Sequence, residues 1–324
     1  MTIQGIETEI TSPAEHSVSH CCLICGGSGA QVWMKAPDRF NGRTEQYNLL
    51  RCPSCSLVWL ADPPSALEMG EHYGPDYDRT IANAAKSPTH WLPRRNELLC
   101  HKTGGTLLDL GCASGGFLST LGPSWKLFGV EMSEEAARVA RARCNADVFV
   151  GDILDAPFAP ASFDAITCFN VFEHLYEPAK VLEKVSEWLK PDGVFYTMMP
   201  NIDSAGAKIF GSYWYALELP RHLFHFSPTT LRKIARSVSL EEIVIHTDRD
   251  LYFERSVGYI RDEIVKKIGI TRPPASKSVE PGIPWKVVRK GFRITLLPLI
   301  TAFASVAGDG EMMSAVFTKS GNMI

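Results

Sequence analysis

The chain has 324 residues, of which 45% are hydrophobic and 21% are charged. A chain of this length and composition can bury a full α/β core and still carry one or two added modules. The formal net charge of −3 excludes a general electrostatic attraction to nucleic acid, so we do not expect nucleic acid as a partner.

The N-terminal residues 1–20 are polar and mixed, and they predict a disordered tail. They contain neither a basic region nor an apolar region of the kind that begins a targeting sequence. We therefore expect a cytoplasmic location, where cysteines stay reduced and clustered cysteines bind metal.

Two C-x-x-C pairs follow the tail, in "CCLICGG" and "RCPSCSL". Their four thiolates, from Cys22, Cys25, Cys52 and Cys55, suit a closed tetrahedral zinc site that stabilises a small domain. Cys21 is an alternative ligand, but the C-x-x-C spacing favours Cys22. The scattered cysteines are expected to be buried and inert: Cys100, Cys112, Cys144 and Cys168.

The composition of the chain divides it into segments. We expect a zinc-binding module at 21–62 that ends at an "ADPP" break, and a helical linker or lid at 63–104 that is rich in aromatic residues. The remaining residues, 105–324, form one large domain with an α-helical insertion at 249–311.

From residue 105, strand and helix patterns alternate, which predicts a parallel sheet with helices on both faces. Ser133 is expected to be the N-cap of one helix, and a later helix is expected to end at Lys190, before Pro191. The stretches 241–247 and 313–321 read as two late strands that extend the sheet. A short helix is expected after the glycine turn of the first strand.

That turn lies in "LLDLGCASGGF", residues 107–117. It does not satisfy G-x-G-x-x-G, because Ala113 stands where the second glycine belongs, and this argues against a pyrophosphate cradle. The stretch resembles the first glycine-rich motif of class I S-adenosylmethionine-dependent methyltransferases, (D/E)-x-G-x-G-x-G, with Asp109, Gly111, Ala113 and Gly115 at its four positions.

Neighbouring motifs match the same family over about residues 106–200, including "FDAITCFNVFEHL" and "LKPDGVF". The resemblance implies a Rossmann-like fold with a mainly parallel seven-stranded sheet, and S-adenosylmethionine as cofactor. It places the methionyl and ribosyl parts of the cofactor against the bare turn, both ribose hydroxyls on Glu131 and the adenine amine on Asp152. The expected cofactor-binding residues are Asp109, Gly111, Ala113, Gly115, Glu131, Met132, Asp152, Ile153 and Asn170.

Three histidines are candidate catalytic bases for a weakly acidic acceptor. They are His174 in "FEHL" and His222 and His225 in "ELPRHLFHFS". A structural histidine at a helix start is the alternative for His174, and a packed aromatic hairpin is the alternative for the other two. The Glu173–His174 pair also resembles a segment of polyprenyl-phenol O-methyltransferases that contributes to divalent-metal binding.

The whole arrangement resembles bacterial methyltransferases of sugar, polysaccharide and natural-product pathways. In related sugar C-methyltransferases a similar zinc module precedes the core, and Tyr73 and Tyr77 would lie in a linker that can close over the cofactor. The resemblance implies a small-molecule or sugar-containing acceptor. An RNA methyltransferase and a non-catalytic assembly protein that binds the cofactor are the competing hypotheses.

The segment 292–307 is apolar but contains Arg293 and Pro298, and it is too short for a transmembrane helix. Basic and aromatic residues precede it, so one hypothesis is a helix at a membrane surface. The alternatives are a helix packed over the sheet and a homodimer contact. The residues that favour the membrane are Trp285, Lys286, Arg289, Lys290 and Arg293.

Overall fold

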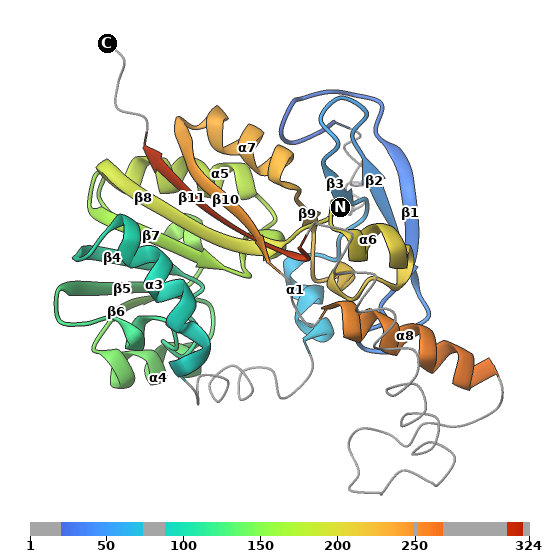
Figure 1. The fold of residues 1–324 in the computed structure, drawn as a ribbon, viewed down its shortest axis with the longest axis horizontal. Helices are drawn as coiled ribbons and strands as arrows, with labels where there is room; N and C mark the ends of the chain where they lie inside the picture. Colours follow the sequence, from blue (N-terminus) through green and yellow to red (C-terminus); the bar gives the residue numbers. More distant parts are fainter. Residues whose placement is uncertain (1–20, 74–87, 249–251, 268–309, 320–324) are drawn as a thin grey trace, which may run out of the picture.

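The computed structural model describes residues 21–73, 88–248, 252–267 and 310–319, which form two sheets lying beside each other (Figure 1). The larger sheet has seven strands in the order β10-β11-β8-β7-β4-β5-β6, and the smaller has four in the order β1-β2-β3-β9. The predicted tail at 1–20, Tyr77 and the apolar segment at 292–307 with its basic residues lie outside the described residues.

The larger sheet confirms the predicted mainly parallel seven-stranded architecture. Strands β4 to β8 within it run parallel, and β11 is inserted antiparallel between β8 and β10, so the two late strands do extend the sheet. Its strands are β4 (Gly105–Leu110), β5 (Trp125–Glu131), β6 (Asp147–Val150), β7 (Phe163–Phe169), β8 (Leu189–Pro200), β10 (Leu240–Asp248) and β11 (Met312–Lys319).

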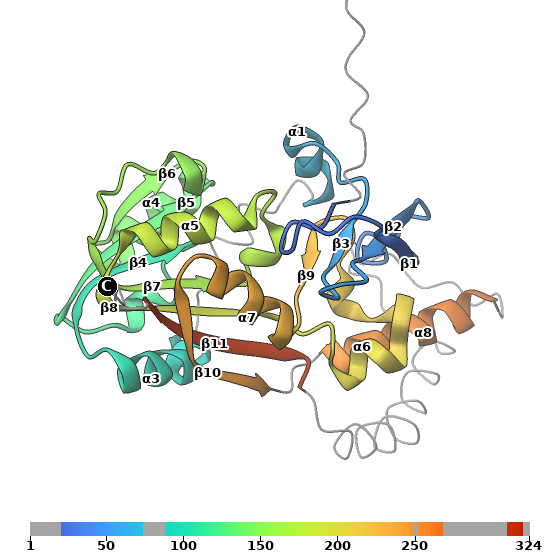
Figure 2. The same ribbon diagram turned by 90° about the horizontal axis from the view of Figure 1, so that it is seen from above.

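Helices cover both faces of this sheet, because successive strand residues point to opposite sides. Leu108 and Leu110 pack in the same core cluster as α5 (Pro178–Trp188) and α7 (Pro228–Ser237). Leu107 packs in a second cluster with α3 (Leu92–His101) and α4 (Glu134–Cys144). Figures 1 and 2 show α5 and α7 side by side on one face.

The helix ends follow local chemistry. The Ser133 hydroxyl accepts a hydrogen bond from the Ala136 N–H, which confirms Ser133 as the N-cap of α4. The prediction that α5 reaches Lys190 is wrong, since the helix ends at Trp188 and Leu189 already pairs with β7. Pro191 disfavours helical backbone at Lys190, which explains the early stop.

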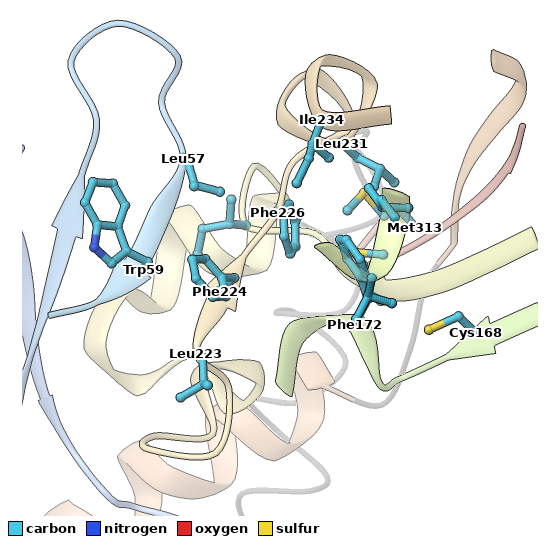
Figure 3. Close-up of a cluster of buried hydrophobic side chains, with 14 of the residues drawn as sticks. Leu57, Trp59, Cys168, Phe172, Leu223, Phe224, Phe226, Leu231, Ile234 and Met313 are labelled. Carbon is cyan, nitrogen blue, oxygen red and sulfur yellow. The ribbon is translucent and has the colours of Figure 1, made fainter. Parts of the chain in front are cut away.

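The smaller sheet consists of β1 (Gln31–Pro37), β2 (Gln46–Arg51), β3 (Val58–Leu60) and β9 (Phe224–His225). Its last strand comes from the large domain, so the predicted zinc module completes its sheet with a distant part of the chain. Figure 3 shows the shared hydrophobic core, in which Leu57 and Trp59 lie near Phe224. The module boundary at residue 62 remains a prediction.

The other described helices are short, apart from α8 (Tyr252–Lys267), which begins the predicted insertion. Only a single 3-10 turn, η3, follows the glycine turn, where a short helix was expected. No helix among the described residues has the length and hydropathy needed to cross a membrane. The remaining helical elements are α1 (Ala66–Met69), α6 (Ala205–Phe210), η1 (Gly70–His72), η2 (Pro88–Trp91), η3 (Leu118–Thr120), η4 (Ile153–Asp155), η5 (Phe172–His174), η6 (Gly211–Tyr213) and η7 (Tyr215–Leu217).

Candidate active site

The predicted cofactor residues gather at the carboxyl ends of the parallel strands. Asp109 near the end of β4 is paired with Gly129 of β5 and with Thr167 of β7, so the three strand ends are adjacent. Glu131 ends β5, and Asn170 directly follows β7. This is the edge at which open α/β sheets bind ligands.

The Glu131 carboxylate is held in place by two backbone groups. One oxygen accepts the N–H of Ala113 at 2.9 Å and the other accepts the N–H of Ser133 at 2.9 Å. Ala113 occupies a left-handed conformation, with φ +47°, at the centre of the glycine turn. Because each carboxylate oxygen can accept more than one hydrogen bond, Glu131 keeps the capacity to bind ribose hydroxyls.

Asp109 lies deeper than Glu131 and is buried. Its Oδ1 accepts a hydrogen bond of 2.6 Å from the Thr167 hydroxyl. Burial raises the pKa of Asp109 to about 7, against the effect of the Thr167 hydrogen bond, and the nearby Glu131 raises it further. A positively charged ligand at this edge would therefore favour the ionised form of Asp109.

Two glycines of the turn have a packing role that the sequence did not reveal. A Cβ on Gly111, at φ +70°, would lie 2.4 Å from Cγ2 of Val171. A Cβ on Gly115, at φ +71°, would lie 3.0 Å from Sγ of Cys144 and 3.1 Å from Cα of Ala140 in α4. The bare turn thus admits neighbouring protein atoms at these two positions, and its contact with a cofactor remains a prediction.

The other predicted cofactor residues surround this edge. Met132 is 71% exposed, and Asp152 and Asn170 are also exposed. Asp152 is the N-cap of η4 and accepts the N–H of Leu154 at 2.8 Å, whereas Ile153 is buried. The exposed members are open to a ligand, as adenine and ribose contacts require.

A second group of polar side chains combines two residues that follow β7 with one that precedes β9. Potential ligand atoms of Glu173, His174 and His222 all lie within 4.8 Å of one another. The rings of His174 and His222 meet edge to face, with their centroids 4.6 Å apart. Val171, which packs against Gly111, connects this group to the glycine turn. These three residues are the Glu173–His174–His222 cluster.

Hydrogen bonds fix the tautomers of both histidines in the cluster. Nδ1 of His174 lies 2.9 Å from the Arg221 carbonyl, and Nδ1 of His222 lies 2.8 Å from the Ala216 carbonyl. Because a carbonyl only accepts, each Nδ1 carries the proton and each Nε2 presents a lone pair. Burial lowers the pKa of both histidines to about 3, and His222 adds to the effect at His174, whereas His225 adds to it at His222.

Glu173 is the third member and is 2% exposed. Neither of its carboxylate oxygens has a hydrogen-bond partner among the described residues. Burial raises the pKa of Glu173 to about 8. One carboxyl group and two imidazole lone pairs in a buried space can remove a proton, and their donor set is also one that a divalent cation accepts.

His225 is not a member of the Glu173–His174–His222 cluster. Its ring centroid lies 6.2 Å from that of His222, and its Nε2 has no partner among the described residues. Burial lowers its pKa to about 3. It occupies β9 opposite Val58, within the shared core.

The sequence analysis missed Glu218 and Arg221, which the structure places beside the cluster. Arg221 donates to Glu218 at 2.7 Å, and its guanidinium carbon lies 3.8 Å from the ring centroid of Phe40. The Tyr73 hydroxyl lies 3.4 Å from Nδ1 of His174, so the linker does reach the cluster. Two charged residues within the aromatic run "ELPRHLFHF" were the available signal.

The four cysteines predicted as metal ligands lie together in the described structure. Their sulfur atoms are all within 4.8 Å of one another, with Cys22 3.3 Å from Cys55 and Cys25 3.6 Å from Cys52. Burial acts to raise the pKa of Cys52, but hydrogen bonds from the backbone N–H groups of Cys55 and Ser54, together with the neighbouring thiols, outweigh it and lower the pKa to about 6. Four convergent thiols fit tetrahedral zinc, as the sequence predicts.

The scattered cysteines follow the sequence prediction only in part. Cys112 and Cys168 are buried and Cys144 is half-buried, but Cys100 is exposed, so its predicted burial is wrong. Cys100 lies on the outer side of α3, where its thiol donates to the Asn96 carbonyl. Cys21 is also exposed and lies outside the group of four.

The fold and the strand-end site together define a Rossmann-like α/β protein of the class that binds a nucleoside ligand. A family model described as a methyltransferase domain matches residues 80–243. A ubiquinone biosynthesis O-methyltransferase from Paraburkholderia phymatum is 34% identical over 179 residues, which cover 49% of this chain and 75% of that relative. The chain belongs to this methyltransferase family and is an S-adenosylmethionine-dependent methyltransferase.

Solved structures show the same fold. A chain of the complex between the Haloferax volcanii Trm112 methyltransferase activator and a methyltransferase has a TM-score of 0.51 at 20% identity, covering 75% of this chain and 97% of that one. Phosphoethanolamine N-methyltransferase 2 of Haemonchus contortus, solved with S-adenosyl-L-methionine, has a TM-score of 0.50 at 19% identity, covering 77% and 59%.

Proposed function

We propose that the chain transfers a methyl group from S-adenosylmethionine to a small-molecule or glycosyl acceptor bound beside the Glu173–His174–His222 cluster. The observation that carries this proposal is the convergence of three proton-accepting side chains, of which Glu173 and His222 are buried and His174 is half-buried, with potential ligand atoms within 4.8 Å of one another. Two members of the cluster, Glu173 and His174, directly follow β7, next to the strand ends that carry the expected cofactor residues.

S-adenosylmethionine supplies a methyl group that is already activated by its positive sulfur, so positioning contributes much of the rate enhancement. The protein must hold the acceptor in line and take its proton. Glu173 suits the second task, because a general base works best when its pKa lies near the working pH, and its pKa is about 8. His174 and His222, with lone pairs on Nε2, accept hydrogen bonds from an acceptor hydroxyl. We retain His225 as a more distant candidate.

The acceptor class is supported by charge and by a relative. The net charge of −3 does not favour a polyanionic substrate. The relative from Paraburkholderia phymatum is named for ubiquinone biosynthesis, in which the methylated compound is a small molecule. The members of the cluster are polar, as recognition of a hydroxylated acceptor requires.

The test is methyl transfer by the full chain from S-adenosylmethionine with a labelled methyl group. Phenols, nucleoside-diphosphate sugars and a bacterial small-molecule extract are offered in parallel with ribosomal RNA. We expect label in a small molecule, and loss of that label in Glu173→Gln with cofactor affinity retained.

Two outcomes would reject the proposal. Label in RNA, with affinity that falls steeply as salt rises, would identify an RNA methyltransferase. Tight cofactor binding without any labelled product would identify an assembly protein, since the fold alone does not guarantee turnover.

The four cysteines are proposed to hold a structural zinc ion. Four ligands close the coordination shell and leave no position for water or substrate, so the metal would stabilise rather than react. We also propose the predicted division into a tail at 1–20, a module at 21–62, a linker at 63–104 and a methyltransferase domain at 105–324. A cytoplasmic location and homodimer formation remain predictions.

A further inference from the structure

The second cysteine pair leads directly into β3. Cys52 follows β2, and the N–H of Cys52 donates to the Leu57 carbonyl at 2.9 Å while the N–H of Ser56 donates to the Cys52 carbonyl at 3.0 Å. Ser56 has a φ of +68°, so the turn is tight. The position of Cys52 and Cys55 therefore determines where β3 begins.

Strand β3 then pairs with β9 of the large domain. Val58 lies opposite His225 and Trp59 opposite Phe224, and the Leu60 N–H donates to the Leu223 carbonyl at 2.8 Å. Figure 3 shows Trp59 on its strand beside the chain that carries Phe224. A strand of two residues has little stability of its own, so β9 depends on this pairing.

The chain around β9 is also hydrogen-bonded to the turn that carries Glu173. The Leu223 N–H donates to the backbone carbonyl of Glu173 at 2.8 Å, and the Ile202 N–H donates to the Phe226 carbonyl at 2.9 Å. Residues 218–226, the acceptor-side segment, are thus held between the cysteine module and the turn after β7. The segment carries His222, whose ring contacts His174.

A metal ion would join the two cysteine pairs firmly. The thiol contacts of 3.3 Å and 3.6 Å between the pairs are weak hydrogen bonds at best. A bound tetrahedral ion would replace them with four bonds to ligands from both ends of the module. The turn at Cys52 and Cys55, and β3 with it, would then have one fixed position.

We propose that the metal-bound cysteine module positions the acceptor-side segment, so that Val58, Trp59 and Leu60 act as positioning residues that place His222 against His174 and Glu173. This inference rests on the proposed function, since it assigns the module a part in that site. Among the described residues, the hydrogen bonds that hold the cofactor edge at β4 and β5 lie within the larger sheet and its glycine turn, and the edge meets the cluster side through the packing of Val171 against Gly111. Loss of metal should therefore disturb the acceptor side and spare cofactor binding.

The test combines zinc removal with hydrogen exchange in the full chain. Zinc content is measured before and after chelation, and exchange is followed in peptides from 218–226 and from β4 and β5. We expect exchange in 218–226 to accelerate by roughly tenfold or more on loss of zinc, with β4 and β5 unchanged. The affinity for S-adenosylhomocysteine should stay within about twofold by calorimetry.

A milder variant distinguishes a local effect of zinc loss from general unfolding. Cys25→Ser removes the one exposed ligand, and Cys100→Ser, an exposed cysteine outside the module, is its matched control. We expect the imidazole NMR signals of His222 and His174 to shift in Cys25→Ser only, with zinc content reduced. Unchanged exchange in 218–226 after proven zinc loss would overturn the proposal, as would exchange that rises equally throughout the chain.

Failure of the proposed function gives a different result. A chain that does not bind S-adenosylhomocysteine with zinc present, or that methylates RNA, would refute the assigned reaction. The coupling of zinc to the exchange of 218–226 is measured without an acceptor and can hold or fail independently.

Discussion

The carboxylate of Glu131 accepts the backbone N–H of Ala113 at 2.9 Å, so the end of β5 is bonded directly to the glycine turn after β4. A substitution here removes a ligand acceptor and loosens the turn at once. We expect Glu131→Ala to weaken S-adenosylhomocysteine binding by at least about 30-fold, which corresponds to about 2 kcal/mol for a lost charged hydrogen bond. Isothermal titration calorimetry measures the effect.

Glu135→Ala is the matched control for this experiment. Glu135 lies in the first turn of α4, just after the end of β5, but its carboxylate is exposed and pairs with Arg138. Its loss should leave the affinity within about twofold, because an exposed ion pair contributes little. Equal affinities for wild type and Glu131→Ala would show that the cofactor lies elsewhere.

Substitutions of Gly111 and Ala113 in the glycine turn should change the stability of the fold to different extents. Gly111→Ala would force a Cβ to within 2.4 Å of Val171 in a left-handed conformation, and we expect it to destabilise the fold by about 2 kcal/mol or more. Ala113→Gly should change the free energy of unfolding by less than about 1 kcal/mol, because glycine adopts φ +47° without strain. Urea denaturation of both variants makes the comparison, and equal effects would contradict it.

Asp109 makes the stability of the ligand-free protein depend on pH. Its pKa of about 7 lies above the unfolded value, so the folded state keeps a proton that the unfolded state releases. Stability should therefore fall as pH rises from about 4 to about 7 and stay reduced above that range. Asp109→Asn keeps the shape and can still accept from Thr167.

We expect Asp109→Asn to raise the free energy of unfolding at pH 8 by on the order of 3 kcal/mol and to give little gain at pH 4. The same variant should bind S-adenosylhomocysteine more weakly. Thermal unfolding at the two pH values is the measurement, and a gain of equal size at both would show that the carboxyl group does not titrate in this range.

The sequence predicted the larger sheet well, because its strands are continuous apolar runs that end at turns. Ser133 was identifiable as an N-cap from its place before two acidic residues. Strand β9 was not identifiable, since two residues carry no periodicity and their partner, β3, is distant in the chain.

The residues of the candidate site also divide into those that the sequence made recognisable and those that it did not. Positions such as Glu131 were recognisable because they end strands in a fixed order, and the structure places them at one edge. The packing reason for Gly111 was not recognisable, because the sequence does not say that Val171 approaches it. Arg221 and Glu218 were missed because their importance comes from their position next to His222, which depends on the tertiary fold.

Three histidines, of which His222 and His225 are buried and His174 is half-buried, should make the fold sensitive to acid. The pKa values of His174, His222 and His225 are lowered to about 3, so the folded state stays neutral while the unfolded state takes up protons below about pH 6.5. Their stabilising contribution is complete above that pH and is lost progressively as pH falls towards 3. His225→Phe removes one of the three groups.

Between pH 6 and 4 these three histidines make the free energy of unfolding fall as pH falls. We expect His225→Phe to reduce their contribution to this slope by about one third. Denaturant unfolding at several pH values gives the slope. His246→Gln, which changes an exposed histidine that pairs with Glu97, serves as the control. A slope that His225→Phe leaves unaltered would mean that His225 does not stay neutral in the fold.

Glu173 should determine how the reaction rate depends on pH. Its pKa of about 8 means that the carboxylate form, which accepts the proton, increases as pH rises through 8. With the acceptor found in the labelling experiment, kcat/KM should therefore rise between about pH 6.5 and 8 and level off towards about pH 9. We expect Glu173→Gln to lower kcat/KM by about 100-fold or more and to remove this rise, while the affinity for S-adenosylhomocysteine is kept.

Glu177→Gln is the control, because that exposed carboxylate pairs with Lys180 at the start of α5. A variant Glu173→Gln that keeps the wild-type pH profile would assign the proton transfer to another group, with His174 and His222 the nearest candidates.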